Sequence, residues 1–88
     1  MNDDEKRIIP LIKMTENQEG IIHALEGGGQ FQTRLQALNI RIGKRVKKIS
    51  ATPFRGPVVI EVERSKVAIG HGMAQKVLVA VSDRKPRP

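Results

Sequence analysis

The side chains that could hold a metal ion or transfer a proton are sparse in this sequence. Divalent transition metals are commonly bound by imidazole and carboxylate groups, often by two histidines and one carboxylate. The two histidines, His23 and His71, are 48 residues apart and show no ligand spacing, although Glu26, Met73 or Asp83 could assist them. We therefore assign no metal ligand, and we interpret His23 as a strand residue and His71 as a turn residue.

The other reactive residues do not predict an enzyme. The sequence has no cysteine, and no motif supports a Ser-His-Asp triad or a catalytic pair of carboxylates. Glu61 and Glu63 share one strand face, but they alternate with apolar residues and are expected to face solvent. The glycines of Gly27–Gly29 lack the Lys-Ser/Thr pair that completes a phosphate-binding loop. We assign no catalytic residue and no cofactor.

Basic residues give the chain a formal net charge of +7, and their densest cluster lies between residues 41 and 48. Three interpretations of this cluster are open: a solvated strand edge, where lysines deter edge-to-edge pairing; a contact with an acidic protein or membrane surface; and a contact with nucleic acid. Two phenylalanines and no tyrosine or tryptophan leave little for base stacking, so nucleic acid is not expected. The cluster consists of Arg41, Lys44, Arg45, Lys47 and Lys48.

Short apolar runs separated by glycine and proline predict a mostly β fold. About five strands are expected, with one short α-helix after the first, and strands this short favour a small barrel that hides its edges. The apolar stripe Phe31, Leu35 and Leu38 predicts the helix. The expected strands are Gly20–Leu25, Gly43–Ile49, Val58–Glu63, Lys66–Ile69 and Lys76–Val81, the helix is Gln30–Asn39, Thr52–Pro57 is a loop, and Gly70–Ala74 is a break with room for one helical turn.

Residue spacing also predicts local backbone geometry. Asn39 stands where the chain must turn left-handed after the helix, a conformation that asparagine tolerates. Val46 and Ile49 are three residues apart, so a β-bulge or a bend is needed for both to face the core. In the run 21–25, odd-numbered and even-numbered positions are both apolar, so the core face of that strand is ambiguous.

The length permits one domain with a modest core. Polar and charged ends predict a flexible N-terminal segment at residues 1–9 and a flexible tail at residues 83–88, which leaves residues 10–82 for the domain. The apolar run Ile8 to Ile12 is interrupted by Pro10 and is far shorter than the about 20 residues of a membrane-spanning helix. We expect a cytoplasmic protein that does not cross a membrane.

An ordered set of spaced residues runs from roughly Pro10 to Val81: Gly20-Ile21-Ile22, Leu25, Gly27-Gly28, Arg34-Leu35, Leu38-Asn39-Ile40, Gly43, Val46, Gly56-Pro57, Val67-Ala68-Ile69, Ala74 and Val77. This set resembles the FeoA family, ferrous iron transport protein A. Two positions depart from the family pattern: Asn39 replaces a glycine, and Ile69-Gly70 replaces a leucine followed by a basic residue.

The resemblance implies a non-enzymatic cytosolic protein with an SH3-like barrel, similar in fold to the C-terminal domain of the diphtheria-toxin-repressor family. It also implies an accessory role in ferrous iron transport, with a FeoB-like membrane transporter as the protein partner. The chain would then lie beside the membrane through that partner alone. Two alternatives stay open: a basic nucleic-acid-binding module, and a domain that senses or delivers a transition metal.

The expected recognition surfaces are the helix and the loop before Val58. Phe54 in that loop is either a core residue folded under the loop or an exposed anchor, and phenylalanine and arginine are both enriched in interface cores. The candidate partner-binding residues are Arg34, Gln36, Lys44, Arg45, Lys47, Phe54 and Arg55.

Overall fold

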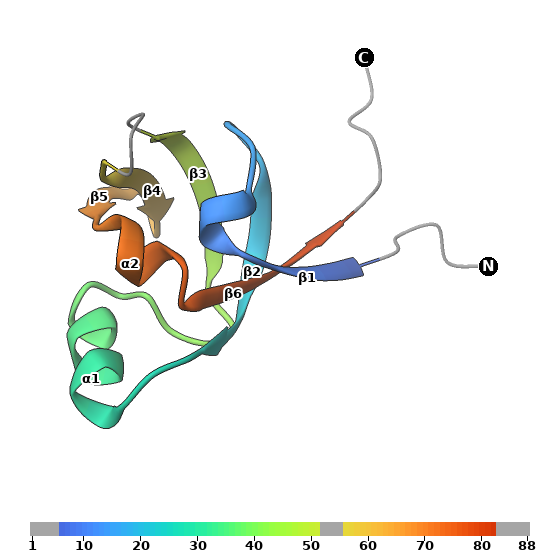
Figure 1. Cartoon of the computed structure of the whole chain (residues 1–88). Coiled ribbons are helices and arrows are strands. Elements are labelled where there is room, and N and C mark those ends of the chain that lie inside the picture. The colour runs from blue at the N-terminus through green and yellow to red at the C-terminus, as the bar shows by residue number, and fades with distance from the viewer. Residues whose placement is uncertain (1–5, 52–55, 83–88) are drawn as a thin grey trace, which may run out of the picture.

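The computed structural model describes residues 6–51 and 56–82, and within them the chain forms six strands and three short helices (Figure 1). None of these helices is long and apolar enough to span a membrane. In chain order the elements are β1 (Lys6–Pro10), the 3-10 helix η1 (Leu11–Lys13), β2 (Glu19–Leu25), α1 (Gly29–Ala37), β3 (Arg45–Ala51), β4 (Val58–Val62), β5 (Ser65–Ile69), α2 (His71–Ala74) and β6 (Val77–Ser82).

The strands form a single antiparallel sheet in the order β1-β6-β2-β3-β4-β5, which curves around the core (Figure 1). The mostly β class is confirmed. The expected barrel of about five strands is wrong, because the sheet has six strands and its edge strands, β1 and β5, do not pair with each other within the described residues. The helix α1 follows the second strand rather than the first.

The additional strand is β1, in a segment that the sequence assigned to a flexible region at residues 1–9. Its residues pair with β6 in continuous register, from Lys6 opposite Ser82 to Pro10 opposite Leu78. The polar and charged residues at the start of the chain predicted a flexible end. Pro10 is compatible with the strand, because an edge strand needs ladder bonds on one side only. Its pairing partner, β6, lies about 70 residues further along the chain, so a local sequence pattern does not predict the pairing.

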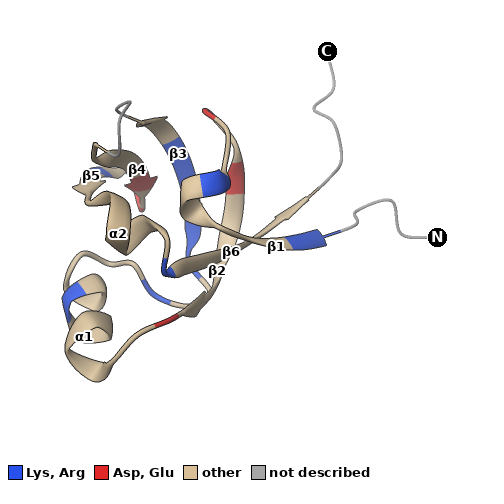
Figure 2. Cartoon of the chain, viewed as in Figure 1, with Lys and Arg blue, Asp and Glu red and all other residues tan. Residues whose placement is uncertain are grey.

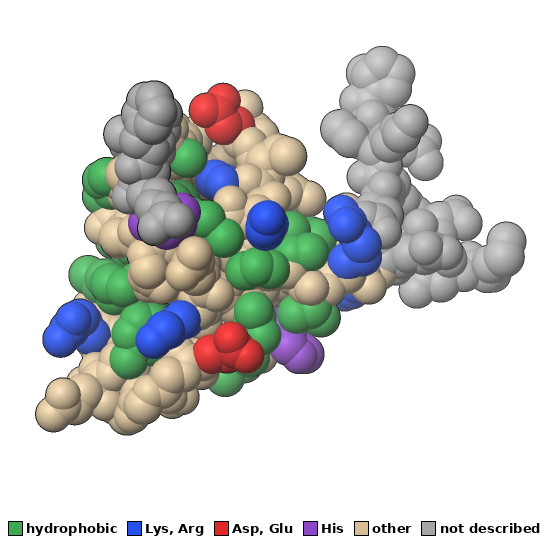
Figure 3. Space-filling view, viewed as in Figure 1, with side chains coloured by type: hydrophobic (Ala, Val, Ile, Leu, Met, Phe, Trp, Pro, Cys, Tyr) green, Lys and Arg blue, Asp and Glu red, His purple; other side chains and the backbone are tan. Residues whose placement is uncertain are grey.

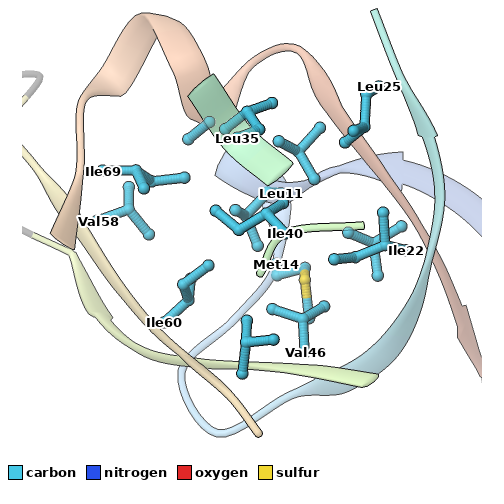
Figure 4. Close-up of a cluster of buried hydrophobic side chains, with 14 of the residues drawn as sticks. Leu11, Met14, Ile22, Leu25, Leu35, Ile40, Val46, Val58, Ile60 and Ile69 are labelled. Carbon is cyan, nitrogen blue, oxygen red and sulfur yellow. The ribbon is translucent and has the colours of Figure 1, made fainter. Parts of the chain in front are cut away.

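One core fills the concave side of the sheet. Side chains from the strands, α1 and η1 converge in it, as Figure 4 shows for ten labelled residues. Ile60 and Val62 are fully buried, which confirms the inward face expected for their strand. The buried hydrophobic residues are Leu11, Met14, Ile22, Leu25, Leu35, Ile40, Val46, Val58, Ile60, Val62, Ile69, Ala74, Val77, Val79 and Val81.

A β-bulge in β2 resolves the ambiguous core face. The register with β6 shifts between Ile22 and Ala24, so His23 is the extra residue. The shift lets Ile22 and Leu25 both point into the core, although they are three positions apart. His23 is exposed, and as expected it is a strand residue.

The bulge expected in β3 is also present, between Lys48 and Ser50, but it does not bring Ile49 into the core. Val46 and Lys48 occupy successive inward positions, and Lys48 is only 5% exposed. Ile49 is half-buried at the bulge itself. The sequence therefore predicted the position of the bulge correctly, whereas the expectation that Ile49 faces the core is wrong.

Three turns place non-glycine residues in the left-handed region, and the first of them contains Asn17, with φ of 69°. Asn39 has φ of 65°, which confirms the conformation expected after the helix. Glu63 and Arg64 have φ of 51° and 68° and form the two-residue turn between β4 and β5, one position earlier than expected. His71 is the first residue of α2 rather than a turn residue.

Candidate binding surfaces

The seven predicted partner-binding residues do not form a single surface. Arg34 and Gln36 are exposed on α1, whereas Lys44, Arg45 and Lys47 belong to β3 and the residue before it. Phe54 and Arg55 lie outside the described residues. The described residues therefore fall into two separate regions, one at β3 and one at α1.

The basic residues of β3 belong to a row of alternating charge that crosses four strands. On the outer face of the sheet, Lys47 lies between Glu19 of β2 and Glu61 of β4, and Glu61 lies opposite Lys66 of β5. Figure 2 shows the basic colour of β3 beside acidic positions on β2 and β4. Opposite charges directly across a ladder attract, so this row satisfies its own charges.

The neighbouring residues are paired in the same way. Lys44 Nζ lies 2.6 Å from Glu63 Oε2, and Arg45 Nη1 lies 3.5 Å from Glu19 Oε1. A shallow groove of about 480 Å³ runs over this region, lined by four basic and three acidic side chains together with Gly43. Its charge is therefore nearly balanced, although the densest basic cluster of the sequence contributes three of its lining residues.

Lys48, the last member of the basic cluster, is structural. Its Nζ donates hydrogen bonds to the carbonyl oxygens of Met14, at 2.5 Å, and Ile12, at 3.1 Å. Burial lowers the pKa of Lys48, and the nearby charge of Glu16 opposes part of that change. A side chain held in this way ties η1 to β3 and is not available to a partner.

The second region is the surface of α1 and the segment after it, here called the α1 surface and defined by Arg34, Gln36, Leu38, Arg41 and Ile42. Leu38 was expected in the buried stripe of the helix, but it is 37% exposed, and Ile42 is 66% exposed. Arg34 and Leu38 are one helical turn apart and share a face. Figure 3 shows hydrophobic and basic side chains side by side over α1.

The exposed residues of the α1 surface are held by ordered neighbours. Ile40 is fully buried, and its amide donates to the carbonyl oxygen of Leu35 at 3.0 Å. The amide of Gly43 donates to the carbonyl oxygen of Ile22 at 2.8 Å. Ile42 lies between these two hydrogen-bonded positions, so the ordered backbone itself holds its side chain in solvent.

The α1 surface also has uncompensated positive charge. No aspartate or glutamate occurs between Glu26 and Glu61 in the sequence. Arg41 Nε donates to the carbonyl oxygen of Gln36 at 3.4 Å, near the negative end of the helix dipole, and in the described part of the chain neither Arg34 nor Arg41 forms an ion pair. Arg41 and Ile42 are not among the predicted partner-binding residues, and this carboxylate-free stretch does not single them out, because it also contains Lys44 and Arg45, which pair with Glu63 and Glu19.

The histidines lie apart, as the two separate purple patches of Figure 3 show. His71 Nε2 is 3.3 Å from Gln75 Nε2, and His23 is exposed at the bulge of β2. Among residues 6–51 and 56–82, no three His, Cys, Asp or Glu side chains gather into a group that could hold a metal ion.

Known proteins with related sequences and folds cover most of this chain. The FeoA domain model matches residues 9–81. A Methanocaldococcus jannaschii protein named "Putative Fe(2+) transport protein A" is 36% identical over 70 residues, which are 80% of this chain and 83% of the relative.

Solved structures agree on the fold. The crystal structure of an iron uptake regulatory protein (FeoA) superposes with a TM-score of 0.78 at 29% identity, covering 83% of this chain and 96% of the other. A manganese-dependent transcriptional repressor superposes with a TM-score of 0.79 at 18% identity over 89% of this chain and 43% of its own, which is a likeness of fold. Because the domain model spans nearly the whole described chain, and the Methanocaldococcus jannaschii relative is identical at more than a third of the 70 aligned residues, the chain belongs to the FeoA domain family.

Proposed function

We propose that this chain is a non-catalytic cytoplasmic accessory protein of ferrous iron transport, which binds the cytosolic part of a FeoB-type transporter through the α1 surface. Family membership supports the link to ferrous iron transport. The observation that supports binding is the combination of the exposed Leu38 and Ile42 with Arg34 and Arg41 on an ordered backbone. A large apolar side chain held rigidly in water favours a contact surface.

The charge of the α1 surface indicates the chemistry of the partner. Two arginines without facing carboxylates favour an acidic protein surface, because complementary charge raises the association rate and suppresses unsuitable partners. Leu38 and Ile42 would then contact apolar side chains at the centre of the interface. Nucleic acid is less favoured than the sequence suggested, since Lys44 and Arg45 are engaged by Glu63 and Glu19.

The proposal is tested by measuring binding of the purified chain to the cytosolic domain of a FeoB-like transporter encoded in the same genome. The variants Arg34→Glu and Ile42→Ser should each weaken binding by about tenfold or more, as expected for central interface residues. Lys13→Glu makes the same charge change as Arg34→Glu at an exposed position of η1 and should bind like the wild type. The affinity of the wild type should also fall as salt increases.

Two results would contradict the proposal. If the wild type does not bind the transporter domain, the assignment of the partner is wrong. If the wild type binds but Arg34→Glu, Ile42→Ser and Lys13→Glu all bind equally well, the partner is correct and the α1 surface is not the contact.

A further inference from the structure

The outer face of the sheet has two halves of different chemistry. Over β3, β4 and β5 the outward side chains include the charged row described above. Over the middle of β1, β6 and β2 they are apolar, next to an outward polar row of Lys6, Ser82 and Glu19. We call this middle part the apolar face, defined by Ile8, Pro10, Ile21, Ala24, Leu78 and Ala80. Leu78 and Ala80 alternate along β6 with the buried Val77, Val79 and Val81, so they point away from the core, and the other four residues are their register partners on β1 and β2.

Register places these six residues in two adjacent rows. Ala80 of β6 lies opposite Ile8 of β1 on one side and opposite Ile21 of β2 on the other. In the next row, Leu78 lies between Pro10 and Ala24. Ile8 is 46% exposed and Ile21 is 36% exposed. An antiparallel sheet with one face in water normally carries polar residues at such positions, as Lys47, Glu61 and Lys66 do on the other half of this sheet.

The apolar face contains both a protrusion and a hollow. Ala80 is the small residue between two isoleucines, and a depression of about 210 Å³ lies beside it, lined by Lys6, Glu19, Gly20, Ile21, Arg45, Ala80 and Ser82. The rim of this depression therefore carries charges of both signs. A strongly acidic or strongly basic partner would meet a like charge there, whereas a surface that also carries both signs would not.

We propose that the apolar face binds a second copy of the same chain, forming a two-fold symmetric dimer in which the outer faces of the two sheets stack. A two-fold contact requires one patch that is complementary to itself. The apolar face meets that requirement, because it has both protruding isoleucines and a depression, and the rim of the depression carries charges of both signs. A two-fold axis that runs along the strands between β6 and β2 places Ala80 of each copy opposite Ile21 of the other. The isoleucine then fills the hollow beside the alanine.

The apolar face is small for the interface of a stable dimer. Stable interfaces use about 20–30 residues on each side, and this face offers fewer. The dimer should therefore be weak, with a Kd on the order of 10⁻⁴ M, and should form at high protein concentration.

The test is sedimentation velocity of the purified full chain alone, from about 10 μM to about 1 mM, which brackets that Kd. The wild type should shift from monomer to dimer over this range. Ala80→Arg places a long charged side chain in the centre of the contact and should remain monomeric. The matched control is Ala68→Arg, because Ala68 is an exposed outward alanine on β5 at the other end of the same sheet face, and this variant should dimerise like the wild type.

Circular dichroism of each variant shows whether it is folded. If Ala80→Arg does not fold, Ile8→Glu, at an exposed position of β1, replaces it in the sedimentation experiment and should also remain monomeric. A wild type that stays monomeric at about 1 mM would overturn the proposal, and so would a dimer that Ala80→Arg and Ile8→Glu both leave intact. If instead these variants are monomeric like the wild type but lose the transporter domain, the face belongs to that partner, and the proposed dimer is likewise overturned.

Discussion

Lys48 Nζ donates a hydrogen bond of 2.5 Å to the carbonyl oxygen of Met14, which lies 34 positions earlier in the chain. A lysine that a linear reading places in a solvated basic cluster is in fact buried against the backbone after η1. A buried ammonium persists when several acceptors compensate its lost hydration, and here two carbonyl oxygens do so. This contact fixes the path of the segment that joins β1 to β2.

Replacing Lys48 with methionine should destabilise the fold. Methionine keeps most of the packing of the lysine stem but leaves the carbonyl oxygens of Met14 and Ile12 without their donor. The cost of such a loss is about 1–3 kcal/mol. Urea denaturation of wild type and variant measures it, and a variant as stable as the wild type would show that water satisfies both carbonyls.

The same pair of proteins should show a characteristic pH dependence. Since burial lowers the pKa of Lys48, the unfolded chain binds more protons than the folded chain at pH values between the folded and unfolded pKa. The contribution of Lys48 to the free energy of unfolding therefore rises with pH through that alkaline window and is smallest below it. The stability difference between wild type and Lys48→Met should increase as the pH rises through the alkaline range toward the ordinary lysine pKa of about 10.4, and a difference that is constant or decreases would contradict the lowered pKa.

Reversing the charge of Lys47 should reduce the stability of the fold. If Lys47 lay on a solvated strand edge without charged neighbours, the same change would leave the stability nearly unchanged. Lys47→Glu places three carboxylates in line, with Glu19 and Glu61 on either side. Like charges opposite each other cost a few tenths of a kcal/mol to about 1 kcal/mol per pair, and salt reduces the effect. Thermal denaturation should order the variants as Lys13→Glu, Lys47→Gln and Lys47→Glu, from most to least stable, and equal melting temperatures would argue against the charge row.

Gly20 should not tolerate a side chain. A Cβ atom at this position would lie 2.5 Å from Val79 Cγ1 and 2.6 Å from the carbonyl oxygen of Ala80, where β2 approaches β6. Gly20→Ala should cost about 1–3 kcal/mol, as overpacking does. Gly72→Ala is the opposite case, because the helical Gly72 has open space around its Cβ position, so this variant should be neutral or more stable by up to about 1 kcal/mol.

Asn39 should accept glycine but resist valine. Its φ of 65° lies in the left-handed region, which glycine adopts freely and a β-branched residue adopts with strain. We expect Asn39→Gly to be neutral or stabilising and Asn39→Val to lose about 1–2 kcal/mol. Chemical denaturation compares the two, and equal stability of the valine and glycine variants would contradict the argument.

Truncating Ile60 to alanine should reduce the stability of the fold more than truncating its neighbour Val59 in β4. Ile60 is fully buried and Val59 points outward. Ile60→Ala should cost about 2–4 kcal/mol, whereas Val59→Ala should cost much less. Melting temperatures of the two variants measure the contrast, and a change under about 2 °C for Ile60→Ala would be incompatible with its burial.

Features that depend on a few consecutive residues could be read from the sequence. The alternation of β4, the left-handed Asn39 and the bulge in β3 all arise from local backbone sterics and residue period, which act within one element. The order of spaced residues was likewise sufficient to indicate the family. The exposed position of Leu38 was not local in this sense, because it depends on which side of α1 meets the core.

The tertiary structure alone decided how the basic residues and the apolar strand faces are used. Lys44 and Arg45 pair with Glu63 and Glu19, and Lys47 lies in register between Glu19 and Glu61, only when β2, β3 and β4 lie side by side. The apolar face exists because Ile8, Ala80 and Ile21, from three distant segments, share one row. Charge balance and patch area are properties of neighbours in space, and an antiparallel sheet makes neighbours of residues that no sequence window contains together.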